Sequence, residues 1–304
     1  MMTWITIGLS AATLLLMAVF FSFVLGWANR AFHVPEDPRV EACIGMLPGA
    51  NCGGCGFVGC REYAVAVVHD GAAVDRCTVG GAETAINLAA IMGVRLDASL
   101  PYRPVVHCGA HFEDRRMRPP YRGEARCAAA NLVTGVQGCT YGCLGFGDCQ
   151  RACNFDAIHV IDGLATVDYE RCVGCGACAR ACPRNIITMV PFKAERVLVV
   201  ACSNHDAGKD VQRVCDVGCV ACKACQRASS LFTVEDNLSV IDYDAYNPAN
   251  LGDALAAMKK CPRRRLTFVG KPLPEDLEAV ADEKMPAVVT ADFKTTVDDT
   301  EWRG

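Results

Sequence analysis

The stretch CVGCGACARACP, residues 172–183, decides how the centre of this chain folds. Its cysteines are Cys172, Cys175, Cys178 and Cys182, and a proline follows the last of them. The spacing C-x2-C-x2-C-x3-C-P is a ligand pattern for iron–sulfur clusters, in which three thiolates hold one cluster and the fourth serves another. The run therefore predicts two neighbouring [4Fe–4S] clusters, and it needs further cysteines from another segment.

Those further cysteines lie upstream, in CTYGCLGFGDCQRAC, residues 139–153. The crossed-ligand rule predicts one cluster bound by Cys153, Cys172, Cys175 and Cys178. It predicts another cluster bound by Cys139, Cys143, Cys149 and Cys182. Between the two groups, AIHVIDGLATVDY predicts two short strands around a turn at Asp162-Gly163. This is the layout of a two-cluster ferredoxin domain, which we expect over residues 136–192.

A related but incomplete pattern follows in CVACKACQRASS, residues 219–230, where Ser229 replaces the expected fourth cysteine. The later segment VEDNLSVIDYDAY resembles IDGLATVDYERC, and it predicts a second hairpin with its turn at Asp236-Asn237. Crossed ligation leaves one complete set, which is Cys219, Cys222, Cys225 and Cys261. The other set has no cysteine, and Tyr246 stands at one of its positions. We therefore expect a half-degenerate, one-cluster ferredoxin domain over residues 193–272.

An earlier group of cysteines has a different spacing, C-x2-C-x4-C-x16-C. Its members are Cys52, Cys55, Cys60 and Cys77. After Cys60, REYAVAVVHDG predicts a short helix that ends at Gly71 and returns the chain towards the first cysteines. Four thiolates suit a [4Fe–4S] cluster or a zinc ion, and the spacing alone leaves zinc open here. We expect a small helical domain over residues 30–95.

Five cysteines remain outside these four sets: Cys43, Cys108, Cys127, Cys202 and Cys215. Cys108 and Cys202 each end an apolar, strand-like run shortly before a cluster-binding unit. Cys127 and Cys215 come next in each case, a parallel that indicates a repeated local structure. The simpler interpretation is a set of buried thiols, and the alternative is a further metal site or redox pair.

The N-terminal segment indicates where the protein resides. Residues 1–28 carry no charged side chain. This segment is long enough for a helix that spans a bilayer, so we expect an anchor over residues 1–29. A cleaved signal peptide would need a basic start and a shorter apolar core. Arg30, Arg39 and Arg61 follow the span, which places the remaining domains on the cytoplasmic side of the cell's inner membrane. A reducing cytoplasm favours metal thiolates over disulfides.

Composition and charge restrict the possible partners. The chain has 304 residues, 21 cysteines and a formal net charge of −4, and no basic face indicates a nucleic-acid partner. The segment KKCPRRR, residues 259–265, is either a surface that steers an acidic electron carrier or ordinary solvated charge near lipid headgroups. Residues 96–135 are expected to form a connector and residues 273–304 a mobile tail.

Taken together, the anchor, LPGANCGGCGFVGC (residues 47–60) and GCTYGCLGFGDC (residues 138–149) with the ferredoxin run after it resemble one family. This family is RnfB, the B subunit of the Rnf complex, an ion-translocating ferredoxin:NAD+ oxidoreductase, which shares its architecture with the complex that reduces the SoxR sensor. A proline commonly follows two of the family's cysteines, but Thr78 and Asn154 stand there in this chain. Neither change removes a ligand.

The resemblance implies an electron-transfer subunit that accepts low-potential electrons from soluble ferredoxin. It implies partners in the membrane: flavin-carrying and other membrane subunits, and a separate NAD-reducing subunit. The chain has no strand–G-x-G-x-x-G–helix pattern and no phosphate loop, so we expect no substrate site of its own. The alternatives are an electron-transfer subunit of a SoxR-reducing complex, a stand-alone polyferredoxin without ion pumping, or a zinc-bound structural protein.

The predicted architecture is therefore α+β. A single N-terminal transmembrane helix comes first, followed by a small helical [4Fe–4S] domain. Two ferredoxin-like units come last, the second of them half-degenerate. The predicted cofactors are four [4Fe–4S] clusters, whose iron is bound through the sixteen cysteines of the four sets given above.

Overall fold

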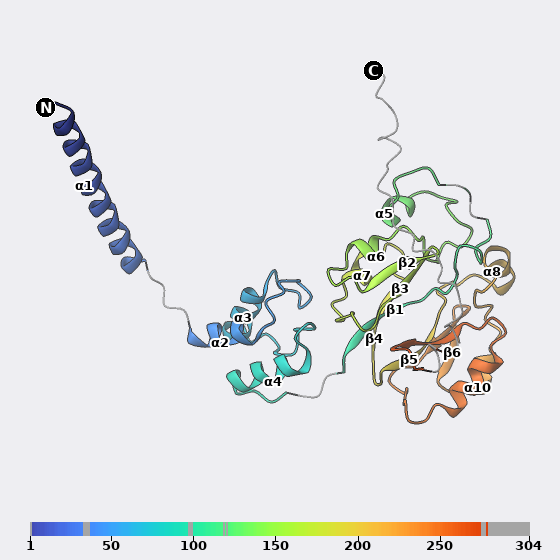
Figure 1. The fold of residues 1–304 in the computed structure, drawn as a ribbon. Helices are drawn as coiled ribbons and strands as arrows, with labels where there is room; N and C mark the ends of the chain where they lie inside the picture. The colour runs from blue at the N-terminus through green and yellow to red at the C-terminus, as the bar shows by residue number, and fades with distance from the viewer. Residues whose placement is uncertain are drawn as a thin grey trace, which may run out of the picture.

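A computed structural model of the chain describes residues 2–32, 37–96, 100–117, 119, 121–274 and 278. The fold is α+β, and a long N-terminal helix, a small helical unit and a larger body of short strands and helices follow one another (Figure 1). Apart from residues 273, 274 and 278, the tail expected over 273–304 lies outside the described residues.

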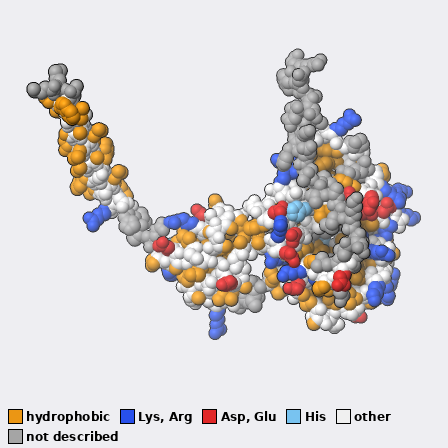
Figure 2. Space-filling model, viewed as in Figure 1, with side chains coloured by type: hydrophobic (Ala, Val, Ile, Leu, Met, Phe, Trp, Pro, Cys, Tyr) orange, Lys and Arg blue, Asp and Glu red, His pale blue; other side chains and the backbone are white. Residues whose placement is uncertain are grey.

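The N-terminal helix α1 (Met2–Ala31) is apolar around its whole circumference. Its segment Ile7–Ala31 has 25 residues and is the one candidate membrane span among the described residues. At 1.5 Å per residue, this segment is about 37 Å long, which exceeds the ~30 Å hydrocarbon core of a bilayer. Figure 2 shows apolar side chains along the part of α1 that it colours, and none of the span is buried against other described residues. Such a surface is stable in lipid and not in water.

Three helices build the first folded unit: α2 (Pro38–Met46), α3 (Cys60–His69) and α4 (Gly81–Met92). The helix predicted after Cys60 is confirmed as α3. Tyr63 is 1% exposed, and its hydroxyl donates to the Ala73 carbonyl over 2.8 Å and accepts from the Arg76 amide over 3.2 Å. These bonds fold the segment after α3 back over the helix, and they return the chain towards Cys60.

The first ferredoxin-like unit contains two antiparallel strand pairs. The inner hairpin pairs β2 (Ile158–Ile161) with β3 (Leu164–Val167), so the predicted turn at Asp162-Gly163 is confirmed. The outer pair joins β1 (Tyr102–Val106) to β4 (Ile187–Pro191). Three short helices lie in the loops, α5 (Cys127–Ala130), α6 (Asp148–Arg151) and α7 (Ala177–Ala181). Because β1 falls within residues 96–135, that segment is part of the unit rather than only a connector.

The second unit repeats this plan. Its inner hairpin is β6 (Phe232–Glu235) and β7 (Leu238–Ile241), with the predicted turn at Asp236-Asn237. Both turn residues have positive φ, 49° and 60°, as a two-residue hairpin of this kind requires. The outer pair is β5 (Arg196–Val200) with β8 (Leu266–Gly270). Its helices are α8 (Gly208–Val214), α9 (Ala224–Ala228) and α10 (Gly252–Lys260).

In the second unit an apolar core stands where the cysteine-free half would otherwise hold a cluster. Tyr246 is 2% exposed and packs in one core with Phe232 and with Ala254 and Ala257 of α10. The Tyr246 hydroxyl accepts a hydrogen bond from the Leu198 amide over 3.2 Å. Side chains thus replace the volume and the cross-links of the missing cluster.

The two ferredoxin-like units are joined by several hydrogen bonds. The His107 ring contacts the Val200 carbonyl through Nδ1 over 2.9 Å. The Arg265 guanidinium donates to the Gly109 carbonyl over 2.9 Å, across 156 positions of sequence. These bonds hold the segment that follows β1 against the end of β5 and the start of β8.

Candidate metal centres

The cysteines of the first unit surround one cavity of about 330 Å³. These are Cys52, Cys55, Cys60 and Cys77. Cys60 begins α3, where the Asn51 side chain accepts from its amide over 2.9 Å. The Gly80 amide donates to the Cys77 sulfur over 3.3 Å. Backbone N–H groups aimed at sulfur are a common feature of thiolate cluster sites. Cys43 does not line this cavity and is fully buried in α2, as expected for a packed thiol.

A second group lies around α7 in the first ferredoxin-like unit. Burial, followed by the neighbouring thiols of Cys172, Cys175 and Cys153, raises the pKa of Cys178 to about 11. The Ala157 amide donates to the Cys153 sulfur over 3.4 Å. The structure therefore brings together the crossed-ligand set that contains Cys153.

The relocated set in the second unit is also brought together. Cys219, Cys222, Cys225 and Cys261 line one cavity of about 390 Å³. The Arg265 amide donates to the Cys261 sulfur over 3.4 Å, and the Cys225 sulfur lies 3.1 Å from the Ser239 hydroxyl. Among the described cysteines, Cys222 alone is exposed.

For the remaining set the structure differs from the sequence prediction. Cys143, Cys149 and Cys182 line a cavity of about 380 Å³, but the fourth cysteine there is Cys127 and not Cys139. The Asp148 carboxylate of α6 explains the difference, because it accepts from the amide of Cys127 over 3.1 Å and from that of Ala128 over 2.9 Å. These bonds fix the start of α5 beside α6.

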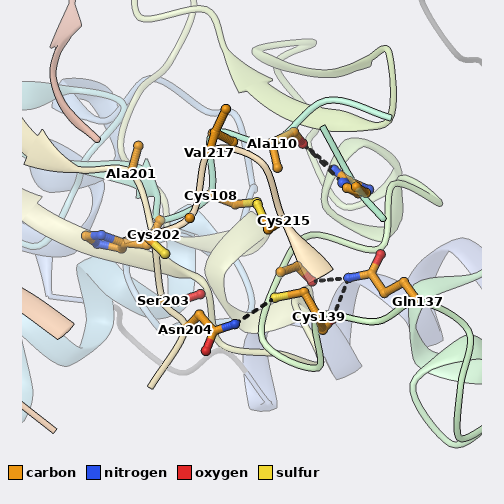
Figure 3. A pocket seen from close by; sticks show the side chains of 15 residues that line it. Cys108, Ala110, Gln137, Cys139, Ala201, Cys202, Ser203, Asn204, Cys215 and Val217 are labelled. Carbon is orange, nitrogen blue, oxygen red and sulfur yellow. Dashed lines mark hydrogen bonds between the residues drawn. The ribbon is translucent and has the colours of Figure 1, made fainter. Parts of the chain in front are cut away.

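Cys139 faces a different cavity. Arg184 donates to the carbonyls of Cys139 and Gly142 over 3.0 and 2.7 Å, and it fixes the course of this loop. The cavity, of about 400 Å³, is also lined by three cysteines that the sequence left without a role (Figure 3): Cys108, Cys202 and Cys215. The sequence signal for them was the parallel between the Cys108–Cys127 and Cys202–Cys215 segments.

The chemistry of these cavities suits clusters better than single ions. A zinc ion needs four donors at about 2.3 Å. Among the described residues, no three His, Cys, Asp or Glu side chains lie close enough to hold one metal ion. Four of the cysteine sets instead line cavities of similar size, from about 330 to 400 Å³. Four cysteines around one cavity are the usual ligand set of a [4Fe–4S] cluster.

Electrostatics indicates that these cysteine sets bind a cation. Burial raises the pKa of Cys202 to about 11 and also raises the pKa of Cys149, where neighbouring thiols add to the effect. Thiolates are disfavoured in such cavities unless a cation compensates their charge. Cluster iron would supply that charge.

Comparison with known proteins identifies the family. Residues 47–79 match the putative Fe-S cluster family, and residues 165–188 match the 4Fe-4S binding domain. The chain is 43% identical over 228 residues to the B subunit of the Na(+)-translocating ferredoxin:NAD(+) oxidoreductase complex of Acetobacterium woodii, which covers 74% of this chain and 68% of the relative. The chain belongs to the RnfB family. This confirms the resemblance inferred from the sequence.

This chain aligns with a larger share of two further relatives in the RnfB family. The B subunit of the ion-translocating oxidoreductase complex of Methanosarcina acetivorans is 37% identical over 79% of this chain and 89% of the relative. The B subunit of the proton-translocating ferredoxin:NAD(+) oxidoreductase complex of Clostridium ljungdahlii is 33% identical over 84% of this chain and 90% of the relative. The family models match residues 47–79 and 165–188. Cys108, Cys127 and the second ferredoxin-like unit lie outside these two segments.

The basic segment 259–265 was expected either to steer a carrier or to be solvated charge, but two of its arginines bind backbone carbonyls. Arg263 donates to the carbonyls of Gly218 and Cys215 over 3.1 and 2.8 Å. Arg265 donates to the carbonyls of Gly109 and Arg263, both over 2.9 Å. Of the three consecutive arginines, only Arg264 is exposed. The residues that remain free to steer an acidic carrier are therefore the exposed Arg264, Lys259 and Lys260.

Proposed function

We propose that this RnfB-family chain accepts low-potential electrons from reduced ferredoxin and passes them into a membrane complex that reduces NAD+ and translocates Na+ or H+. Membership in the family makes the chain an iron–sulfur electron-transfer subunit of an ion-translocating oxidoreductase complex. The relatives differ in the ion that their names give, sodium in one and protons in another.

The chain's own part in this function is to hold [4Fe–4S] clusters in fixed positions. Such clusters accept and release single electrons at potentials from about −700 to +450 mV, set by burial and by hydrogen bonds to sulfur. The ligand sets that we propose are Cys52, Cys55, Cys60 and Cys77; Cys153, Cys172, Cys175 and Cys178; Cys127, Cys143, Cys149 and Cys182; and Cys219, Cys222, Cys225 and Cys261.

The observation that carries the proposal is the distribution of these sets. Each of the three folded units holds at least one cysteine set. The first of these units follows α1, and the last contains the exposed Cys222. An exposed ligand allows a soluble donor to approach closely at one end. The helix α1 places the other end beside the membrane, in agreement with a membrane-anchored subunit of a larger complex.

The partners follow from this arrangement. We propose that soluble ferredoxin is the donor and that membrane subunits with flavin carriers are the acceptors. NAD+ reduction is assigned to a separate subunit, because no dinucleotide-binding motif occurs in the sequence. We also propose that the folded units lie on the cytoplasmic side of the inner membrane, which the basic residues after the span support.

The test uses the intact complex in native membranes with a Cys261→Ala substitution. We expect loss of about four irons per RnfB chain, and a large fall in NAD+ reduction by reduced ferredoxin, while the other subunits still copurify. Cys43→Ala is the matched control, since Cys43 is buried but lines no cluster cavity. Full iron content and full activity in the Cys261→Ala complex would contradict the proposal.

A further inference from the structure

We propose a fifth [4Fe–4S] site, formed between the two ferredoxin-like units by Cys108, Cys139, Cys202 and Cys215. Two of its cysteines come from each unit, so neither unit could form it alone. The proposal rests on the four cluster sites of the proposed function and adds one more. With this site, every cysteine except Cys43 would be a cluster ligand.

The site is built from a structural repeat. Cys108 lies two residues beyond the end of β1 at Val106, and Cys202 lies two residues beyond the end of β5 at Val200. The sulfur of Cys108 accepts from the Cys143 amide over 3.5 Å, and the sulfur of Cys202 accepts from the Cys219 amide over 3.3 Å. The same turn thus presents one cysteine from each unit to the space between them.

The other two sulfurs face the same space. A Cβ atom added at Gly142 would lie 3.4 Å from the Cys139 sulfur and 3.7 Å from the Cys108 sulfur, so both are close to one point. Cys215 is 7% exposed and lines the same cavity as Cys108 and Cys139. Figure 3 shows the four cysteines around a common cavity of about 400 Å³.

A buried cation also faces this cavity. Arg115 is 8% exposed and lines it, and its Nη1 has no hydrogen-bond partner among the described residues. Its other guanidinium nitrogens donate to the carbonyl of Ala110 and, over 2.8 Å, to that of Gly163. A buried unpaired N–H of a charged group is costly, and four thiolates would supply the negative charge that it lacks.

The amide of Asn204 completes the polar lining. Asn204 is 2% exposed and donates from Nδ2 to the Cys139 sulfur over 3.4 Å (Figure 3). Its Oδ1 accepts from the Asp206 amide over 2.7 Å, which fixes the direction of the side-chain amide. A buried donor held towards a cysteine sulfur is what a thiolate ligand requires, and it is not needed by a neutral packed thiol.

Packing alone does not account for this arrangement. Thiols that only fill gaps leave no cavity, as Cys43 shows in the core of the first unit. None of the four cysteines forms a disulfide. The cavity matches in size and in cysteine number the cavities of the sets that contain Cys149 and Cys225.

The position of the site gives it a role. The two amides that point at it belong to Cys143 and Cys219, each of which lines a neighbouring cavity. A cluster here would therefore adjoin one cluster site in each unit. It would connect the second unit's single cluster site to those of the first.

The experiment measures iron and acid-labile sulfide in the full-length chain, purified in detergent without oxygen. We expect about twenty irons per chain, against about sixteen if the fifth site does not exist. This count on the unmodified chain needs no variant to fold. Cys202→Ala is expected to lose about four irons, with the far-UV circular dichroism of the parent retained.

Pairs of substitutions distinguish the ligand sets. Cys139→Ala combined with Cys202→Ala should lose about four irons, as each does alone, because both serve one site. Cys139→Ala combined with Cys143→Ala should lose about eight. About four in the second pair, with no loss from Cys202→Ala alone, would return Cys139 to the Cys143 set and overturn the fifth site. Cys261→Ala would still lose its own irons, so that result would leave the proposed function standing.

Discussion

Gly54 lies directly against Cys175. A Cβ atom at position 54 would stand 2.8 Å from the Cβ of Cys175 and 3.5 Å from its Cα. Gly54 belongs to the loop of the first unit's cysteines, and Cys175 belongs to the ferredoxin run. The absence of a side chain at position 54 therefore lets two cluster-binding loops touch, which keeps the first unit's cluster site close to its neighbour.

Replacing Gly54 with alanine should separate these loops. At 2.8 Å the added methyl group requires a shift of the Cys175 loop, or of the whole first unit. We expect iron content close to that of the parent and at least a several-fold fall in ferredoxin-driven NAD+ reduction by the complex. Gly45→Ala is the control, because a Cβ there meets nothing within 4 Å. Equal rates in both variants would show that the contact does not matter for electron flow.

Arg263→Gln should destabilise the space between the ferredoxin-like units. Arg263 donates to the carbonyls of Gly218 and Cys215, and hydrogen bonds from a charged group contribute about 1.5–3 kcal/mol. We expect a lower midpoint of thermal unfolding, with iron lost from the fifth site first. Arg264→Gln at the exposed neighbouring position should keep the iron and lower only the rate of donor association at low salt. A stable, fully loaded Arg263→Gln chain would contradict the structural role.

Asn204→Asp should lower the reduction potential of the fifth site. The substitution keeps the oxygen that accepts from Asp206, but it removes the N–H donated to the Cys139 sulfur and adds negative charge. Both changes disfavour the reduced cluster, by on the order of tens of millivolts, where about 59 mV is a tenfold change in a one-electron equilibrium. A redox titration followed by electron paramagnetic resonance would measure the shift. An unchanged set of potentials would place Asn204 away from any cluster.

Deleting residues 2–31 should release the chain from the membrane without loss of iron. The helix α1 contributes no side chain to any of the cysteine-lined cavities described. We therefore expect a soluble product with the full iron and sulfide content, recovered in the supernatant after ultracentrifugation. A truncated chain that still sedimented with membranes would indicate a second lipid-binding surface.

Local sequence patterns predicted the elements that depend on local physics. The hairpin turns at Asp162-Gly163 and Asp236-Asn237 follow from residues that tolerate positive φ. The helix after Cys60 follows from a segment that ends at Gly71, and the position of Cys261 beside Cys219, Cys222 and Cys225 follows from the crossed-ligand rule. In each case the information lies within one unit or one repeat.

The assignment of Cys139 could not be predicted in the same way. The ferredoxin rule assumes that neighbouring cysteines in sequence serve one cluster, and the spacing between Cys139 and Cys143 gives no sign of an exception. The difference arises from contacts distant in sequence, such as the Asp148 carboxylate at the start of α5 and the Asn204 amide on the Cys139 sulfur. The Asp148 contact forms when the first unit folds, and the Asn204 contact forms only after the two units have packed together.

The short distance along the chain between α1 and α2 has a consequence for kinetics. Helix α1 ends at Ala31 and α2 begins at Pro38, so the chain between them can extend by at most about 25 Å. The first unit therefore cannot diffuse away from the lipid surface. Its encounters with the proposed membrane acceptors would be effectively intramolecular, at local concentrations on the order of millimolar. If a soluble donor docks near the exposed Cys222, as we propose, only that exchange depends on the abundance of a partner in solution.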